Sequence, residues 1–113
     1  MYNRTAPLDI TIQRRGGVKL PLEWTADGTA VNINGYTIAA QVWDKSRSVK
    51  YADFTVEYTD RPNGKFNISL TPAQTVTFTP NELYYDVKYK QPDNFEDYLI
   101  EGNIFVSEGY TTI

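Results

Sequence analysis

Apolar and polar residues alternate with a period of two along most of this chain, which is the pattern of β-strands that bury one face. Phe66, Ile68 and Leu70 show it most clearly, because each is separated from the next by one polar residue. Within 51–58 the same pattern predicts that Phe54 and Val56 face inward together with Tyr58. The segments that we expect to be strands are 8–13, 18–23, 36–44, 51–58, 64–70, 84–89 and 99–106.

Two local signals refine this pattern. Thr71 is followed by Pro72 and, three residues after the threonine, by Gln74, which is the arrangement of an N-cap, a first-turn proline and a capping box. It predicts one short helical turn near 71–75. Pro21 cannot donate a hydrogen bond to a neighbouring strand, so 18–23 is predicted to be an edge strand or to carry a bulge.

Turn residues such as Asp27-Gly28, Asn34-Gly35 and Pro62-Asn63-Gly64 separate the strands, and Gly and Asn tolerate the positive φ angles of tight turns. About seven strands with turns every ~8–12 residues predict an all-β fold, an antiparallel sandwich or barrel, and we favour the sandwich. The 113 residues suffice for one hydrophobic core. We therefore expect an N-terminal arm over 1–7 and a single β-sandwich domain over 8–113.

Composition narrows the function classes. The chain has no histidine and no cysteine, which excludes Ser-His-Asp and Cys-His catalysis, disulfides, and zinc sites built on these ligands. The net charge of −3 does not favour nucleic acid as a partner, and no apolar run approaches the ~20 residues of a membrane span. The first residues lack the apolar core of a secretory signal. We expect a soluble, non-enzymatic protein that is made in a cytoplasm and needs no cofactor or metal.

The densest acidic group could in principle bind calcium or supply a pair of glycosidase carboxylates. Its spacing matches no calcium-binding loop, and a solvated hairpin is the favoured interpretation. The members of the group are Asp93, Glu96, Asp97 and Glu101.

Two small basic groups could contact phosphates or an acidic partner. The overall acidic balance favours solvated turn residues instead. The first group is Arg14, Arg15 and Lys19, and the second is Lys45, Arg47 and Lys50.

Several aromatic residues fall out of phase with the strongest core positions or outside the strands. Exposed aromatic side chains can anchor a protein interface or form a platform for sugars, and they can also simply cover the second face of a sheet. All three interpretations stay open from the sequence. The candidate interface residues are Trp43, Tyr51, Tyr84, Tyr98 and Tyr110.

The order of features over residues 8–108 resembles a family of small phage and prophage virion proteins, and it is similar to the N-terminal domain of the upper baseplate protein of lactococcal siphophages. No single motif carries the resemblance, which depends on order and spacing. The segments that carry it are 9–12 with Arg15-Gly16-Gly17, 22–25 with Asp27-Gly28, 31–37, 70–75, 85–87 and 101–106.

The resemblance implies an immunoglobulin-like β-sandwich in a virion, often oligomeric, that joins a tail, baseplate or fibre component to its neighbour. A trimer or hexamer would match the symmetry of phage tails. Larger members continue into a coiled coil or a receptor-binding region, whereas this chain ends at Ile113, so the expected role is that of a connector, cap or decoration. The alternative is a carbohydrate-binding sandwich that contacts host glycans through Trp43 and surface tyrosines.

Overall fold

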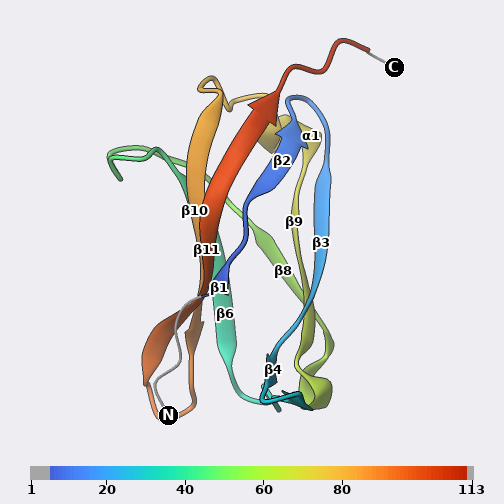
Figure 1. Ribbon diagram of the computed structural model, residues 1–113, viewed down its shortest axis with the longest axis vertical. Coiled ribbons are helices and arrows are strands. Elements are labelled where there is room, and N and C mark those ends of the chain that lie inside the picture. The colour runs from blue at the N-terminus through green and yellow to red at the C-terminus, as the bar shows by residue number, and fades with distance from the viewer. Residues whose placement is uncertain (1–5, 112–113) are drawn as a thin grey trace.

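The computed structural model describes residues 6–111 and consists mainly of β-strands in two facing layers (Figure 1). The first layer is a six-stranded sheet with the order β1-β11-β10-β6-β7, in which β2 also pairs with β11. Its strands are β1 (Ala6–Pro7), β2 (Ile10–Gln13), β6 (Thr37–Trp43), β7 (Lys50–Asp53), β10 (Glu82–Lys90) and β11 (Glu96–Ser107).

The second layer is a three-stranded sheet with the order β3-β9-β8. A separate pair of two-residue strands, β4 (Thr25–Ala26) and β5 (Thr29–Ala30), flanks the predicted Asp27-Gly28 turn. The strands of the second layer are β3 (Val18–Glu23), β8 (Thr55–Asp60) and β9 (Lys65–Leu70), and the short helices are η1 (Arg61–Asn63) and α1 (Pro72–Thr75).

The core lies between the two layers and confirms the inward faces predicted by alternation. Phe66, Ile68 and Leu70 of β9 are buried from one side. From the other side come alternate residues of the first layer, which include Ile38, Ala40, Val42, Leu83, Tyr85, Val87, Ile104 and Val106. Because alternate residues of a strand point to opposite faces, the residues between them form the outer face of the first layer.

The prediction of one strand over 51–58 is wrong. The chain forms β7 in the first layer, crosses at Phe54, and continues as β8 in the second layer. Phe54 is buried at the crossing, and its amide donates to the carbonyl of Ala40 at 2.9 Å. A continuous apolar alternation cannot distinguish one strand from two strands that share a buried junction.

Antiparallel pairing dominates the sheets, but β1 and β2 both pair with β11 in parallel. The predicted first strand begins only at Ile10, and Leu8 lies in the connection between β1 and β2. Of the predicted arm over 1–7, Ala6 and Pro7 form β1, and the remainder lies outside the described residues.

Both local signals are confirmed. The strand that contains Pro21 is the edge strand β3 of the second layer. At the start of α1, the amide of Gln74 donates to the Thr71 hydroxyl at 3.2 Å, and the Thr71 amide donates to the Gln74 side chain at 2.8 Å. The Gln74 side-chain amide also donates to the carbonyl of Asp53 at 3.0 Å, which ties the helical turn to the end of β7.

Replacing Thr71 with alanine is expected to lower the free energy of unfolding by about 0.5–2 kcal/mol, because the substitution removes the oxygen that accepts the Gln74 amide. Urea denaturation followed by circular dichroism measures the change. The neighbouring exposed Ala73 provides a control, since Ala73→Ser leaves both capping hydrogen bonds in place. An unchanged midpoint for Thr71→Ala would contradict the role of the cap.

Candidate functional site

A cavity of about 420 Å³ lies on the outer face of the first layer, between the sheet and the loop that joins β6 to β7. Strands β6, β10 and β11 and this loop all contribute to its lining. The lining residues that bear on its chemistry are Trp43, Arg47, Tyr84, Asp86, Lys88 and Tyr98. A concave site with aromatic walls and a few convergent polar groups is the usual form of a ligand site.

Strand register explains why these side chains meet. Tyr84 of β10 lies opposite Trp43 of β6, and both side chains belong to the outer face. A register shift after Val87 places Tyr98 of β11 opposite Lys88. Residues far apart in the sequence therefore form one continuous surface.

The β6–β7 loop forms one wall of the cavity and is held by Asp44. The carboxylate accepts hydrogen bonds from the amide of Ser48 at 2.6 Å, the amide of Val49 at 3.2 Å and the hydroxyl of Ser46 at 3.1 Å. Burial raises the pKa of Asp44, but the hydrogen bonds outweigh it, and the net pKa is lowered. Arg47, at a positive φ of 59°, places its guanidinium carbon 5.6 Å from the centre of the Trp43 ring.

Several polar groups of the cavity already have partners. The indole of Trp43 donates to the side-chain oxygen of Gln41 at 3.0 Å. The hydroxyl of Tyr84 donates to the carboxylate of Glu101 at 2.9 Å, and desolvation together with this bond raises the pKa of Tyr84 to about 12. Tyr84 therefore stays protonated at neutral pH and acts as a hydrogen-bond donor to Glu101.

Asp86 differs from its neighbours. Among the described residues, its carboxylate has no hydrogen-bond or ion-pair partner, and Glu101 lies directly opposite it on β11. Burial and then the charge of Glu101 raise the pKa of Asp86, whereas Arg47 and Lys88 partly offset this rise. A like-charge pair across two strands destabilises a sheet, so Asp86 is an unfavourable residue for folding alone.

Replacing Asp86 with asparagine is expected to stabilise the protein by about 0.2–1 kcal/mol at neutral pH, because the change removes the repulsion by Glu101. Since the raised pKa means that the folded state binds the proton more tightly, the penalty is present above that pKa and disappears as the pH falls through it. Thermal unfolding of both proteins at pH 7 and at acidic pH measures this. A variant less stable than the parent at pH 7 would contradict the assignment.

The five predicted aromatic residues divide among three places. Trp43, Tyr84 and Tyr98 come together at the cavity. Tyr51 packs against the core and meets Phe78 edge-on, with ring centres 6.1 Å apart. Tyr110 lies away from both, beyond the end of β11, and is 88% exposed.

The predicted acidic group does not gather into one cluster. Asp93 accepts the amide of Phe95 in the β10–β11 turn, and Glu96 pairs with Lys88 at 3.0 Å. Asp97 accepts the amide of Tyr98, and Glu101 accepts the Tyr84 hydroxyl. Within residues 6–111 no three acidic side chains converge as metal ligands would.

None of the helices in the same part of the chain has the length and apolar character of a membrane span.

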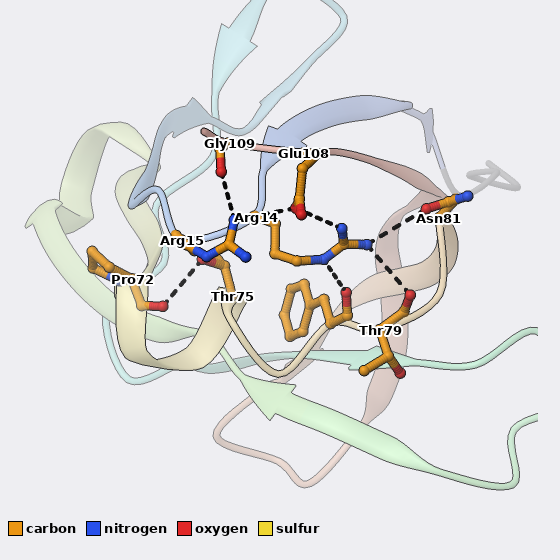
Figure 2. A network of polar contacts seen from close by, with 9 residues as sticks. Arg14, Arg15, Pro72, Thr75, Thr79, Asn81, Glu108 and Gly109 are labelled. Atoms are coloured by element: carbon orange, nitrogen blue, oxygen red, sulfur yellow. Dashed lines mark hydrogen bonds and ion pairs between the residues drawn. The ribbon is translucent and has the colours of Figure 1, made fainter. Parts of the chain in front are cut away.

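The solvated-turn interpretation is wrong for Arg14, whose side chain is only 16% exposed. Figure 2 shows its guanidinium between the β2–β3 turn, the segment that leads into β10, and the segment after β11. It donates to the carbonyl of Phe78 at 2.8 Å, to the carboxylate of Glu108 at 2.8 Å and to the carbonyl of Thr79 at 3.3 Å. We call this set of contacts the Arg14 clasp.

Arg15 and Thr75 make further hydrogen bonds at the same place, and we include these in the Arg14 clasp. The side chain of Arg15 donates to Glu108 and to the carbonyl of Gly109 (Figure 2), and the buried hydroxyl of Thr75 donates to the carbonyl of Gly16 at 2.8 Å. The clasp therefore fixes the chain up to Gly109, immediately before the exposed Tyr110. Nothing in the sequence around Arg14 indicated that its partner would be Glu108, which lies 94 positions away.

The other members of the two predicted basic groups, Lys19, Lys45, Arg47 and Lys50, are exposed. Lys45 pairs with Glu82, and Lys50 pairs with Asp53 at 3.1 Å. Both ion pairs are largely exposed, so they contribute little to stability.

Comparison with known proteins adds no assignment, because no protein-family model matches the chain and no curated protein matches its sequence.

Proposed function

We propose that this chain is a non-catalytic structural protein of a tailed-phage particle that connects a tail, baseplate or fibre component to its neighbour through protein–protein contacts. The context of a phage particle rests on the resemblance of the sequence features.

The proposal includes an immunoglobulin-like β-sandwich, and the strand order supports it. In that fold one sheet contains the third, sixth and seventh strands, and variable-type domains add a strand beside the third. Here β6, β10 and β11 lie in one sheet with β7 added beside β6, whereas β3, β9 and β8 form the other sheet. This arrangement corresponds to the G-F-C-C′ and B-E-D order of the variable type.

The observation that carries the contact role is the combination of Tyr110 with the Arg14 clasp. Tyr110 is exposed, and the chain immediately before it is held by hydrogen bonds to Glu108 and Gly109. An aromatic side chain on a fixed base loses little conformational entropy when a partner covers it, and tyrosine is enriched among the residues that dominate interfaces. Tyr110 is therefore the proposed anchor residue.

Mass spectrometry of purified particles of the parent phage tests the proposal, with the expectation that the protein is present in a fixed ratio to tail proteins. Particles assembled with the Tyr110→Ser variant are expected to contain much less of the variant than wild-type particles contain of the parent protein. Val49→Ser is the matched control, because Val49 is also exposed but lies on the β6–β7 loop. Particles that lack the wild-type protein would overturn the proposal, and equal incorporation of Tyr110→Ser would overturn the anchor.

The oligomeric state gives a second measurement. Size-exclusion chromatography with light scattering is expected to show a trimer or hexamer if the protein forms part of a ring or fibre base. A monomer would assign it to an adaptor that assembles only on its partner.

A further inference from the structure

We propose that the cavity formed by Trp43, Arg47, Tyr84, Asp86, Lys88 and Tyr98 binds one residue of a neutral saccharide. Saccharide binding by this cavity would be a further function, at a surface other than the Tyr110 anchor. It depends on the size of the cavity, on its aromatic walls, and on the balance of its charges.

Size and wall chemistry suit a sugar ring. The volume of about 420 Å³ lies within the range of small-molecule sites, about 300–1,000 Å³. A sugar presents apolar C–H faces and a rim of hydroxyl groups, so a complementary site combines aromatic rings with hydrogen-bonding groups. Trp43, Tyr84 and Tyr98 supply the rings from three different strands.

The charges of the cavity disfavour a charged ligand of either sign. Arg47 and Lys88 would attract an anion, but Lys88 is already paired with Glu96, and Asp86 and the neighbouring Glu101 would repel the anion. The same two cations would repel a lysine or arginine side chain of a partner. A neutral ligand that both donates and accepts hydrogen bonds satisfies both signs, and a hydroxyl group does this.

The uncommitted hydrogen-bonding groups fit that ligand. Among the described residues, the Asp86 carboxylate and the Arg47 guanidinium have no hydrogen-bond partner, so an acceptor and a set of donors both remain free. The oxygen of Gln41 is used by Trp43, which leaves its side-chain NH₂ group as a further donor. Hydroxyl groups of a sugar would therefore find both donors and acceptors.

The site is also partly built before a ligand arrives. Asp44 fixes the loop that carries Arg47, and strand register fixes Asp86 between Gln41 and Glu101. A carboxylate that lies opposite another carboxylate and lacks a partner works against folding, and such local conflicts concentrate at binding sites. A sugar hydroxyl would donate the hydrogen bond that Asp86 lacks.

Nuclear magnetic resonance of the indole N–H groups tests the proposal, because the two tryptophans provide a probe and an internal control. Trp43 lines the cavity, whereas Trp24 packs against Tyr36 and Tyr89. The variant Trp24→Phe assigns the two signals. The ¹⁵N-labelled protein is titrated separately with glucose, galactose, mannose, rhamnose and N-acetylglucosamine, and then with inorganic phosphate and free arginine.

At least one neutral sugar is expected to shift the Trp43 signal saturably while the Trp24 signal stays in place, and phosphate and arginine are expected to leave both unchanged. Asp86→Ala and Arg47→Ala are expected to weaken binding about tenfold or more, since each removes hydrogen bonds to a charged group. Asp53→Ala, an exposed carboxylate on β7 outside the cavity, is the matched control and is expected to bind as the parent does. A well-dispersed spectrum shows that each variant is folded.

Failure of every sugar to shift Trp43 at concentrations that would detect millimolar dissociation constants would overturn the proposal. A response to phosphate or arginine alone would also overturn it, and would assign a charged ligand instead. Unchanged sugar binding by folded Asp86→Ala would remove the cavity as the site. None of these outcomes affects the Tyr110 anchor, which the particle experiment tests separately.

Discussion

Replacing Gly102 with alanine is expected to destabilise the protein by about 3 kcal/mol, the upper end of the usual cost of overpacking a core. A β-carbon at this position would lie 1.9 Å from the carbonyl oxygen of Leu8 and 2.6 Å from its carbonyl carbon. Both are backbone atoms, so no side chain can move aside to make room. The connection between β1 and β2 would have to lift away from β11.

Three contacts oppose that movement. The amide of Leu8 donates to the carbonyl of Glu101 at 2.9 Å, and the hydroxyl of Tyr85 donates to the carbonyl of Leu8 at 2.7 Å. The amide of Asn103 donates to the carboxylate of Asp9 at 2.9 Å. Burial, followed by the charge of Asp9, raises the pKa of Tyr85 to about 12, so its hydroxyl remains a donor.

Urea denaturation of Gly102→Ala measures the loss, with Gly17→Ala as the matched control. At Gly17 the nearest atom to an added β-carbon is the Leu70 carbonyl oxygen at 3.5 Å, an ordinary contact. The control is therefore expected to change stability little. If the two variants unfolded at the same urea concentration, the close approach of Leu8 to β11 would be contradicted.

The alternation of the sequence predicts strands and their inward faces, but it does not identify partners. It correctly placed Phe66, Ile68 and Leu70 inside, because each strand buries its own alternate residues whichever neighbour it has. The parallel pairs that β1 and β2 form with β11 lie on either side of Gly102, whose missing side chain leaves room for the Leu8 carbonyl in the connection between β1 and β2. The pattern places Gly102 inside the predicted strand 99–106, but it gives no sign that another segment of the chain approaches this residue.

The candidate site was predictable to a similar extent. Trp43 and Tyr84 were expected outside the core because they alternate with buried residues, and they lie on the outer face. Tyr51 does not join the other aromatic residues at the cavity. It lies at the register shift between β6 and β7, and its ring contacts Phe78 of the core. Asp86 was not singled out from the sequence, because its significance arises from Glu101 on the adjacent strand.

Replacing Arg14 with alanine is expected to lower the free energy of unfolding by about 2–3 kcal/mol, as is typical when hydrogen bonds that involve a charged group are lost in a partly buried site. The substitution leaves the carbonyl of Phe78 without its guanidinium donor, and it leaves the carboxylate of Glu108 with Arg15 alone. It also disconnects the segment after β11 from the chain that leads into β10 (Figure 2). Chemical denaturation measures the loss.

Arg15→Ala is the matched control, because Arg15 contacts the same carboxylate at 3.2 Å from a side chain that is far more exposed. Exposed ion pairs contribute about 0–1 kcal/mol, so this variant is expected to lose much less stability than Arg14→Ala. Equal losses would show that simple charge, and not the buried geometry of Arg14, holds the clasp.

The pH dependence of Arg14→Ala identifies the interaction. The hydrogen bond from Arg14 lowers the pKa of Glu108, so the stability that this carboxylate contributes is present above its ordinary pKa of 4.5 and is lost as the pH falls through the lowered value. Arg14→Ala removes that hydrogen bond, and the difference in stability between parent and variant is therefore expected to narrow in acid. A difference that stayed constant down to the lowest pH at which the parent is folded would assign the loss to packing and to the Phe78 carbonyl, and not to Glu108.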